Sequence, residues 1–424
     1  MKILVIGNGG REHAIVWRLA RDTERPTLFC APGNAGTAAL ATNLPIGAED
    51  VAGIVAWAKE NRPDLVVVGP EAPLCAGVTD ALEAEGLKVF GPCQAAARLE
   101  GSKSFSKEVM EAAGVPTARF RVYTDSATAI AGLDAFSLPV VVKADGLAAG
   151  KGVVIAQTRA EAEAALHEML DGGRFGAAGA EVVVEEFLDG EEASVFALCD
   201  GERVELLPAA QDHKRVNDND EGPNTGGMGA YTPAPIATPE VMRFTKEQIV
   251  QPVLRELKRR GITYKGVLFC GLMIGSKGVN VLEFNCRFGD PETEVVVPSI
   301  VSDFAPTLLA CAEGRLVEGS VKLCSEAATT VVMAAPGYPN SYPKGMEITG
   351  LAEAEAEGCH VFHAGTALKD GKVVTSGGRV LTVTAFGKDL RAAVDKAYAG
   401  IAKIHFDGAH YRHDIAAKAF KHLK

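Results

Sequence analysis

The chain has 424 residues, of which 47% are hydrophobic and 23% charged, and its formal net charge is −11. The acidic balance argues against a nucleic-acid-binding protein, which would carry a basic face. No apolar run approaches the ~18 residues that a membrane-spanning helix requires. The nine cysteines are scattered and none form Cys-x-x-Cys, which favours reduced thiols in a cytoplasmic protein over a zinc cluster.

The first hundred residues predict one open α/β domain. The glycine-rich turn Gly7 to His13 follows the first strand, but Glu12 takes the third glycine position of a dinucleotide fingerprint and no acid follows the second strand. A phosphate or small substrate at the following helix N-terminus is the better interpretation. Glu71 lies in a Gly-Pro-Glu loop after the third strand, where open α/β sheets bind ligands. We expect strands at 3–6, 28–30, 64–68 and 88–90.

A second glycine-rich segment, Lys143 to Gly152, joins two short predicted strands. Its glycines let the backbone approach a ligand, and its free N–H groups and two lysines can hold a phosphate. Only three residues separate Gly146 from Gly150, and Gly152 stands where a P-loop has Ser or Thr, so that motif does not match. We therefore expect a flap that closes over phosphates, with an ordinary hairpin as the alternative.

Glu185 and Glu186 end a further predicted strand and are followed by Phe187. Backbone groups at this point could read an adenine edge, and the nearby Glu191 could hold ribose hydroxyls. Strands often end in acids, so a plain solvated turn is the alternative.

A polar stretch from Gln211 to Tyr231 precedes a helix expected over 238–261. With Asn217 as position 1 of a calcium loop, position 12 is Met228 and not the required Glu. We expect a mobile lid that closes on substrate, with a solvated loop as the alternative.

Strands at 268–274 and 279–284 are expected to form a hairpin. Alternate strand residues share a face, so Glu283 and Asn285 point the same way. Two hard oxygen ligands suit Mg²⁺ or Mn²⁺. Arg287 lies on the same face if the strand continues, and it can balance phosphoryl charge. The alternative is a polar strand face followed by a surface turn.

From Ala328 onward, short β segments alternate with glycine turns, and an amphipathic helix is expected over 390–405. This pattern predicts a third, β-rich domain with helices. The expected strands are 329–334, 347–349, 360–363 and 379–385.

The flap, the metal pair and the following arginine have the layout of ATP-grasp ligases. The chain closely resembles the phosphoribosylamine–glycine ligase (glycinamide ribonucleotide synthetase) family, and 375–381 extends the resemblance to the full length. The motifs that carry it are Gly-Asn-Gly-Gly-Arg-Glu-His at 7–13, Gly-Pro-Glu at 69–71, Lys-Ala-Asp-Gly-Leu-Ala-Ala-Gly-Lys-Gly at 143–152, Gly-Pro-Asn-Thr-Gly-Gly-Met-Gly at 222–229 and Asn-Cys-Arg-Phe-Gly-Asp-Pro-Glu-Thr at 285–293.

The resemblance implies an ATP-dependent ligase of purine biosynthesis. Its substrates are glycine and 5-phosphoribosylamine, and glycyl phosphate is the intermediate on the way to glycinamide ribonucleotide, ADP and phosphate. We expect a monomer, with a dimer as the alternative. Two other functions stay open: a different ATP-grasp carboxylate–amine ligase or carboxylase of purine metabolism, and a non-catalytic nucleotide-binding module.

The resemblance also implies roles for individual residues. Strand 268–274 lacks the second metal-binding acid that many ATP-grasp enzymes carry, which leaves the number of metal ions open. The expected roles are ATP binding by Lys103, Lys143, Gly146, Gly150, Lys151, Gly152, Glu185, Glu186, Phe187 and Glu191, metal binding by Glu283 and Asn285, substrate binding by Gly9, Gly10, Glu71, Asp212, Lys214, Asp290 and Pro291, and catalysis by Arg287, Lys143, Asp212 and Asp290.

The predicted fold is a multidomain α/β and α+β protein. An N-terminal open α/β domain (1–102) supplies a substrate site. A central ATP-grasp domain (103–327) contains a small flap subdomain at about 122–190, and a C-terminal α+β domain covers 328–424.

Overall fold

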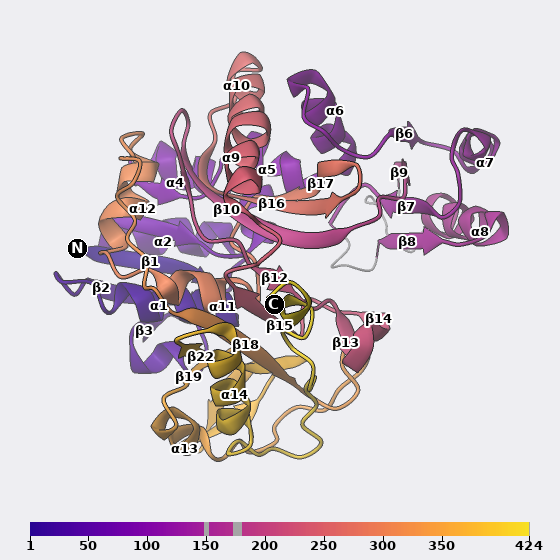
Figure 1. Cartoon of the computed structure of the whole chain (residues 1–424). Coiled ribbons are helices and arrows are strands. Elements are labelled where there is room, and N and C mark those ends of the chain that lie inside the picture. The colour runs from indigo at the N-terminus through magenta and orange to yellow at the C-terminus, as the bar shows by residue number, and fades with distance from the viewer. Residues whose placement is uncertain (148–151, 173–179, 424) are drawn as a thin grey trace.

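The computed structural model describes residues 1–147, 152–172 and 180–423 (Figure 1). Its N-terminal part is a parallel sheet in the order β3-β2-β1-β4-β5. Ile3 to Ile6 of the central strand are fully buried, as is typical of apolar runs in parallel sheets. The strands are β1 (Lys2–Gly7), β2 (Thr27–Pro32), β3 (Thr42–Asn43), β4 (Leu65–Val68) and β5 (Val89–Phe90).

The order of this sheet reverses between β1 and β4. Ile6 pairs with Val68, so the carboxyl ends of β1 and β4 lie side by side at the switch point where such sheets bind ligands. The accompanying helices are α1 (Gly10–Leu19), α2 (Val51–Asn61), α3 (Glu71–Cys75), α4 (Val78–Ala84) and α5 (Gln94–Gly101).

The central part is built on an antiparallel sheet in the order β11-β10-β16-β17. The predicted hairpin is confirmed, with a turn between Gly275 and Gly278. The predicted helix over 238–261 is also confirmed and starts where the Thr238 side chain caps the Val241 N–H; its middle is a π-helical turn. The elements are α6 (Lys103–Ala113), β10 (Glu191–Asp200), β11 (Val204–Leu206), α9 (Pro239–Phe244), α10 (Gln251–Arg259), β16 (Lys265–Gly275), β17 (Gly278–Asn285), α11 (Thr293–Val296) and α12 (Ala305–Ala312).

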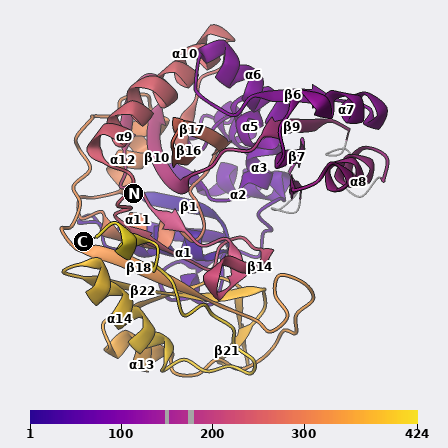
Figure 2. The ribbon, with the colours of Figure 1, turned by 45° about the vertical axis from the view of Figure 1, so that its right-hand side comes forward.

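The predicted flap subdomain is a separate layer that projects to one side of the molecule (Figures 1 and 2). Its antiparallel sheet has the order β6-β9-β7-β8 and its own apolar core against two helices. The elements are β6 (Phe120–Tyr123), α7 (Ser126–Gly132), β7 (Val140–Ala144), β8 (Val153–Ala156), α8 (Arg159–Leu170) and β9 (Val182–Glu186).

The C-terminal part is built on a sheet in the order β12-β15-β18-β22-β19. Two of its strands come from the polar stretch that was expected to form a lid. The elements are β12 (Gln211–Asp212), β13 (Arg215–Asn217), β14 (Glu221–Asn224), β15 (Gly229–Thr232), β18 (Ala327–Ala334), α13 (Leu351–Ala356), β19 (His360–His363), β20 (Thr366–Lys369), β21 (Lys372–Thr375), β22 (Arg379–Gly387) and α14 (Leu390–Ile401).

Two expectations need correction here. The stretch 211–231 is not one continuous loop, because both ends pair as strands and β13 and β14 form a hairpin between them. The expected strand at 347–349 is absent from the described residues, because Glu347 and Thr349 make single bridges to different partners, Val374 and His405, and no ladder forms.

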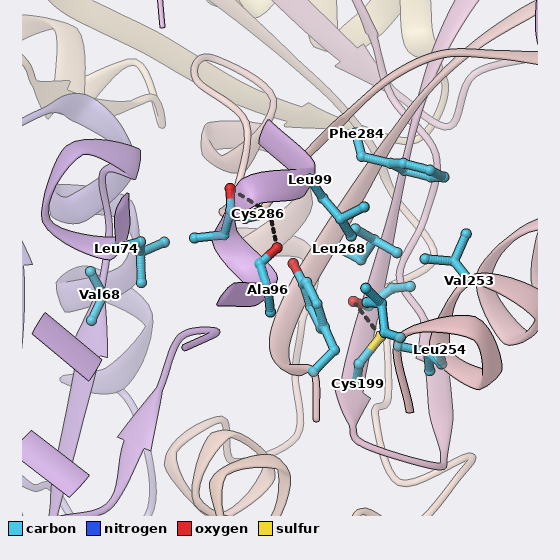
Figure 3. Packing of buried hydrophobic residues seen from close by; sticks show 14 of the residues in the cluster. Val68, Leu74, Ala96, Leu99, Cys199, Val253, Leu254, Leu268, Phe284 and Cys286 are labelled. Carbon is cyan, nitrogen blue, oxygen red and sulfur yellow. Dashed lines mark hydrogen bonds between the residues drawn. The ribbon is translucent and has the colours of Figure 1, made fainter. Parts of the chain in front are cut away.

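One hydrophobic cluster joins the N-terminal and central parts (Figure 3). Val68 and Leu74 belong to the N-terminal part and share this core with Leu268 and Phe284 of the central hairpin. All four are at most 4% exposed. The shared core fixes the ends of β4 and β17 relative to one another. Among the described residues, no helix is both long and apolar enough to cross a membrane.

Candidate active site

The flap lysine Lys143 lies in a buried ion-pair network. Its Nζ is 3.0 Å from Glu185 Oε2, and Lys107 Nζ on α6 is 3.2 Å from Glu185 Oε1. The Glu185 side chain is only 2% exposed. Its carboxylate therefore joins the flap sheet to α6.

Lys103 lies at the start of α6 and contacts the first residues of the flap loop. Its Nζ donates to the Gly146 carbonyl at 3.1 Å and to the Asp145 carbonyl at 3.4 Å. The Asp145 carboxylate accepts from the Ser104 N–H at 2.6 Å, so helix and loop are joined from both sides. The carbonyl of Gly152 accepts from Ala144 N, whereas Gly150 and Lys151 lie outside the described residues.

The expected nucleotide hinge follows β9 directly. Glu186 accepts from the Arg119 N–H at 3.1 Å and pairs with Lys277 at 3.1 Å. Phe187 is 37% exposed, which leaves its ring free to contact a ligand. Glu191 pairs with His422 at 2.8 Å.

Glu283 and Asn285 end β17 and both reach solvent. Neither side chain has a hydrogen bond or ion pair within the described part of the chain. Burial opposes ionisation of Glu283, but the charges of Lys214, Lys143 and Lys103 outweigh it and lower the pKa of its carboxyl. An ionised carboxylate and an amide oxygen without protein partners fit a hard divalent cation. No group of three or more His, Cys, Asp or Glu able to hold a metal occurs in the described ranges.

Arg287 follows the end of β17 and is held by two acids of the N-terminal part. Its guanidinium lies 3.3 Å from Glu71 on α3 and 3.0 Å from Glu100 on α5. Burial opposes ionisation of Glu71, but Arg287 and Arg11 lower the pKa of its carboxyl. The structure thus brings the predicted catalytic arginine and the predicted substrate acid together.

The turn before α1 is occupied by carboxylates of the protein. Glu12 Oε2 accepts from the Gly9 N–H at 2.6 Å, and a side chain at Gly7 or Gly69 would collide with Glu12. Asp290 Oδ2 accepts weakly from the Arg11 N–H at 3.4 Å. The absent glycine of the dinucleotide fingerprint therefore has a physical reason, because Glu12 fills the space beside the turn.

Asp290 also faces the C-terminal part. It forms a 3.0 Å ion pair with Arg379 of β22, and the same guanidinium donates to the Gly226 carbonyl at 2.9 Å. A Cβ on Gly227 would lie 2.4 Å from Pro291 Cδ, so the 226–227 turn packs on Pro291. One arginine thereby joins three segments of the site.

Asp212 and Lys214 lie at and just after β12. Lys214 forms an ion pair with Glu192 of β10. Burial raises the pKa of the Asp212 carboxyl to about 7; Lys214 opposes this, and Glu292 and Glu192 add to it.

We expect Asp212→Asn to flatten the pH dependence of stability. Because the folded-state pKa of Asp212 is raised, its stabilising contribution is complete below pH ~4 and is lost as the pH rises through about 7. Between about pH 5 and about pH 8, urea unfolding should show a wild-type loss roughly 1 kcal/mol larger than that of the variant, a figure discounted for partial solvent access. If the wild type and the variant lost the same stability over this pH range, the raised pKa of Asp212 would be contradicted.

Residue patterns alone missed three residues that contact the predicted site residues: Lys107, Glu100 and Arg379. Lys107 could have been found from the sequence, because it lies four residues after Lys103 on the same helix face. The other two meet their partners only through long-range contacts.

Comparison with known proteins adds independent information. Residues 1–100, 101–293 and 328–418 match models of the N domain, the ATP-grasp (A) domain and the C domain of phosphoribosylglycinamide synthetase. The chain is 53% identical over 423 residues to phosphoribosylamine–glycine ligase of Synechocystis, covering 99% of this chain and 100% of that one.

Solved structures agree with this match. The crystal structure of phosphoribosylamine–glycine ligase from Thermotoga maritima has a TM-score of 0.87 at 37% identity, covering 98% of this chain and 100% of that one. A biotin carboxylase domain from Hydrogenobacter thermophilus has a TM-score of 0.73 at 17% identity, covering 97% of this chain and 91% of that one, which shows a likeness of fold alone.

Proposed function

The chain belongs to the phosphoribosylglycinamide synthetase family, and from this premise we propose that it joins glycine to 5-phosphoribosylamine with conversion of ATP to ADP and phosphate. The observation that carries the proposal is the position of the β17 end. Glu283 feels the positive charges of Lys143 and Lys103, and Arg287 contacts Glu71 beside the carboxyl ends of the N-terminal sheet. This arrangement supports a nucleotide phosphate site beside an amine-substrate site.

In the first step, a glycine carboxylate oxygen attacks the γ-phosphorus of ATP, giving glycyl phosphate and ADP. Such transfer needs positioning and neutralisation of charge more than a nucleophilic side chain. Lys103 and Lys143 supply positive charge, and residues 146–152 cover the phosphates. Arg287 balances charge on the migrating phosphoryl group, and its two acidic partners hold the guanidinium in place.

Glu283 and Asn285 would hold Mg²⁺ or Mn²⁺. These two residues suit such an ion because the Glu283 carboxylate is ionised and unpaired in the described part of the chain, and the Asn285 amide oxygen lies on the same strand. When bound, the ion supplies Lewis-acid neutralisation of phosphate charge.

Adenosine lies against the segment after β9. The backbone at Glu186 and the half-exposed Phe187 contact the base, and Glu191 holds the ribose. We assign the side chain of Glu185 a different part, because it is enclosed by two lysines and orients Lys143.

In the second step, the amine of phosphoribosylamine forms a bond to the acyl carbon, the bond from that carbon to the phosphate oxygen breaks, and phosphate leaves with the electron pair. Asp290 takes the proton released from nitrogen. The glycine end of the site contains Asp212 and Lys214, and the amine substrate contacts Gly9, Gly10, Glu71 and Pro291.

We further propose that the protein is a cytoplasmic monomer with domain boundaries at residues 102 and 327. The nine cysteines are free in the structure, which suits a reducing compartment. The matched N-domain range ends at residue 100 and the matched C-domain range begins at residue 328, which supports the two boundaries, whereas the matched ATP-grasp range ends at residue 293.

The decisive experiment measures ADP release by purified protein with ATP, Mg²⁺, glycine and freshly made phosphoribosylamine. We expect ADP only when both substrates are present, with glycinamide ribonucleotide as the product. ADP release with another acid or amine would mean that the protein is an ATP-grasp ligase with a different substrate. Binding of ATP without any ADP release would indicate a non-catalytic module.

A further inference from the structure

The C-terminal segment 410–418 lies against the β13–β14 hairpin, which comes from the stretch expected to form a mobile lid (Figure 1). His410 Nε2 donates to the Val216 carbonyl at 2.8 Å. His413 contacts Asp218 twice, through its backbone N–H at 2.7 Å and through its ring Nδ1 at 3.0 Å. The hairpin is therefore fastened to a part of the chain about 195 residues further on.

Arg412 is the buried centre of this contact, with only 1% of its surface exposed. Its Nη1 donates to the Asp220 carboxylate at 2.9 Å and to the Arg215 carbonyl at 3.2 Å. Its Nε and Nη2 each donate to Asp414 at 2.7 Å, which makes a bidentate pair. Lys418 binds the other Asp220 oxygen at 2.8 Å. The guanidinium is thus fixed between the C-terminal segment and both ends of the 215–220 turn.

The turn that Arg412 holds has a backbone conformation that needs support. Asn219 and Asp220 have φ angles of 60° and 56°, in the left-handed region that residues other than glycine adopt at a cost. The Asn219 N–H donates to Asp414 Oδ2 at 2.8 Å, so the acid that pairs with Arg412 also holds this turn. Burial opposes ionisation of Asp414, but the hydrogen bonds from Arg412 and Asn219 outweigh it and lower the pKa of its carboxyl to about 2. Such a turn persists where surrounding contacts impose it.

Lys214, a proposed glycine contact, lies directly before the held turn. Its carbonyl accepts from the Thr225 N–H at 2.7 Å and from Thr225 Oγ1 at 2.8 Å, across the hairpin. On its other side, His213 Nε2 accepts from the Ala416 N–H of the C-terminal segment at 3.3 Å. The C-terminal segment thus contacts the chain both before and after Lys214, and the position of Lys214 depends on it.

We propose that Arg412 is a positioning residue for the glycine site, which fastens the β13–β14 hairpin to the C-terminal segment and thereby holds Lys214 ready for glycine. The proposal rests on the proposed function, because that function makes Asp212 and Lys214 the glycine contacts. Arg412 itself touches no reacting group and acts only through the hairpin. The hairpin therefore keeps one position with and without substrate, in contrast to a lid.

The test compares Arg412→Met with Arg412→Lys in steady-state ADP release. Met fills the space without charge, whereas Lys keeps the charge but cannot make the bidentate pair. We expect Met to raise the KM for glycine about 10- to 100-fold, because the released hairpin is in the binding position only part of the time. The kcat at saturating glycine should stay within about 3-fold of wild type, since bound glycine draws the hairpin back, and the KM for ATP within about 2-fold. Lys should give a KM for glycine between those of wild type and Met.

Arg18→Met is the matched control and should leave the KM for glycine unchanged. Arg18 is another buried arginine, 4% exposed, that pairs with Asp22 at 3.0 Å and donates to the Ile300 carbonyl at 2.7 Å. A wild-type KM for glycine in Arg412→Met, or an equal rise in the KM for ATP, would overturn the proposal. So would a Lys variant with a KM as high as that of Met, because the retained charge would then have no effect. If the wild-type protein formed no ADP with glycine and phosphoribosylamine, the proposed function would fail instead, which is a separate outcome.

Hydrogen exchange of the unaltered protein keeps the proposal testable if a variant does not fold, and it does not depend on catalysis. The backbone N–H groups of 213–220, including that of Asn219, should be protected without any substrate present. Adding glycine and a non-hydrolysable ATP analogue should change this protection little. Protection that appears only with these ligands would identify a lid and would overturn the proposal.

Discussion

Replacing Glu283 with Gln should lower kcat by at least ~10²-fold, because a lost metal ligand removes support for transition-state charge. The side chain lies two residues before the end of β17, is exposed, and has no ion pair in the described part of the chain, so its loss leaves no buried partner unpaired. We therefore expect unchanged urea unfolding. Steady-state ADP release at several Mg²⁺ concentrations gives both kcat and the apparent affinity for the metal.

The matched control is Glu111→Gln, an equally exposed acid on α6 of the same domain. It should keep wild-type kcat and metal dependence. Near-normal kcat in Glu283→Gln would contradict the assignment of Glu283 as a metal ligand, even if ATP still bound. A loss of kcat that excess Mg²⁺ restores would support it, because weaker binding of the ion can be overcome by mass action.

The parts of the fold that depend on local patterns could be predicted from the sequence. The strands around Lys143–Gly152 and the hairpin that presents Glu283 are confirmed, because apolar runs bounded by glycine turns identify both. The switch point beside Gly9 and Glu71 follows from the order of strands and turns in an α/β pattern.

The pairing of charged side chains could not be predicted, since it depends on contacts far apart in the chain. Arg287 was expected to face a phosphate, but it is separated from Glu71 by 216 residues and still lies 3.3 Å away. The sequence of β12 and β15 resembles a polar loop because β12 pairs with β15, and β15 pairs with β18 across the predicted domain boundary at 327. Local composition carries no information about such a partner.

The role of Glu185 shows the same limit. As an acid at a strand end it suggested a nucleotide contact, because its sequence neighbours are those of a hinge. The structure instead encloses it between Lys107 and Lys143, which come from a helix and a neighbouring strand. Only the tertiary fold distinguishes a ligand contact from an internal anchor.

Glu185→Ala should destabilise the fold by about 3–5 kcal/mol, because removing one partner leaves two buried lysines uncompensated. Burial lowers the pKa of Lys107 to about 8, and Glu185 opposes this, so without Glu185 the pKa falls further. When a lysine has a lowered pKa in the folded state, the free energy of unfolding of the protein decreases as the pH falls through that pKa. The variant should therefore be weakest at acidic pH, and the deficit should shrink toward about pH 9 as Lys107 deprotonates.

Two further variants decide whether the buried charge is the cause. Glu186→Ala removes the next acid along the chain, which pairs at 3.1 Å with the exposed Lys277, and should cost at most about 1 kcal/mol. The double variant Glu185→Gln with Lys107→Met removes both charges of one pair, so much of the stability should return. Its ADP release should stay low, since Lys143 has still lost the carboxylate that orients it toward the ATP phosphates. A double variant as unstable as Glu185→Ala would mean that packing, and not charge, makes Glu185 necessary.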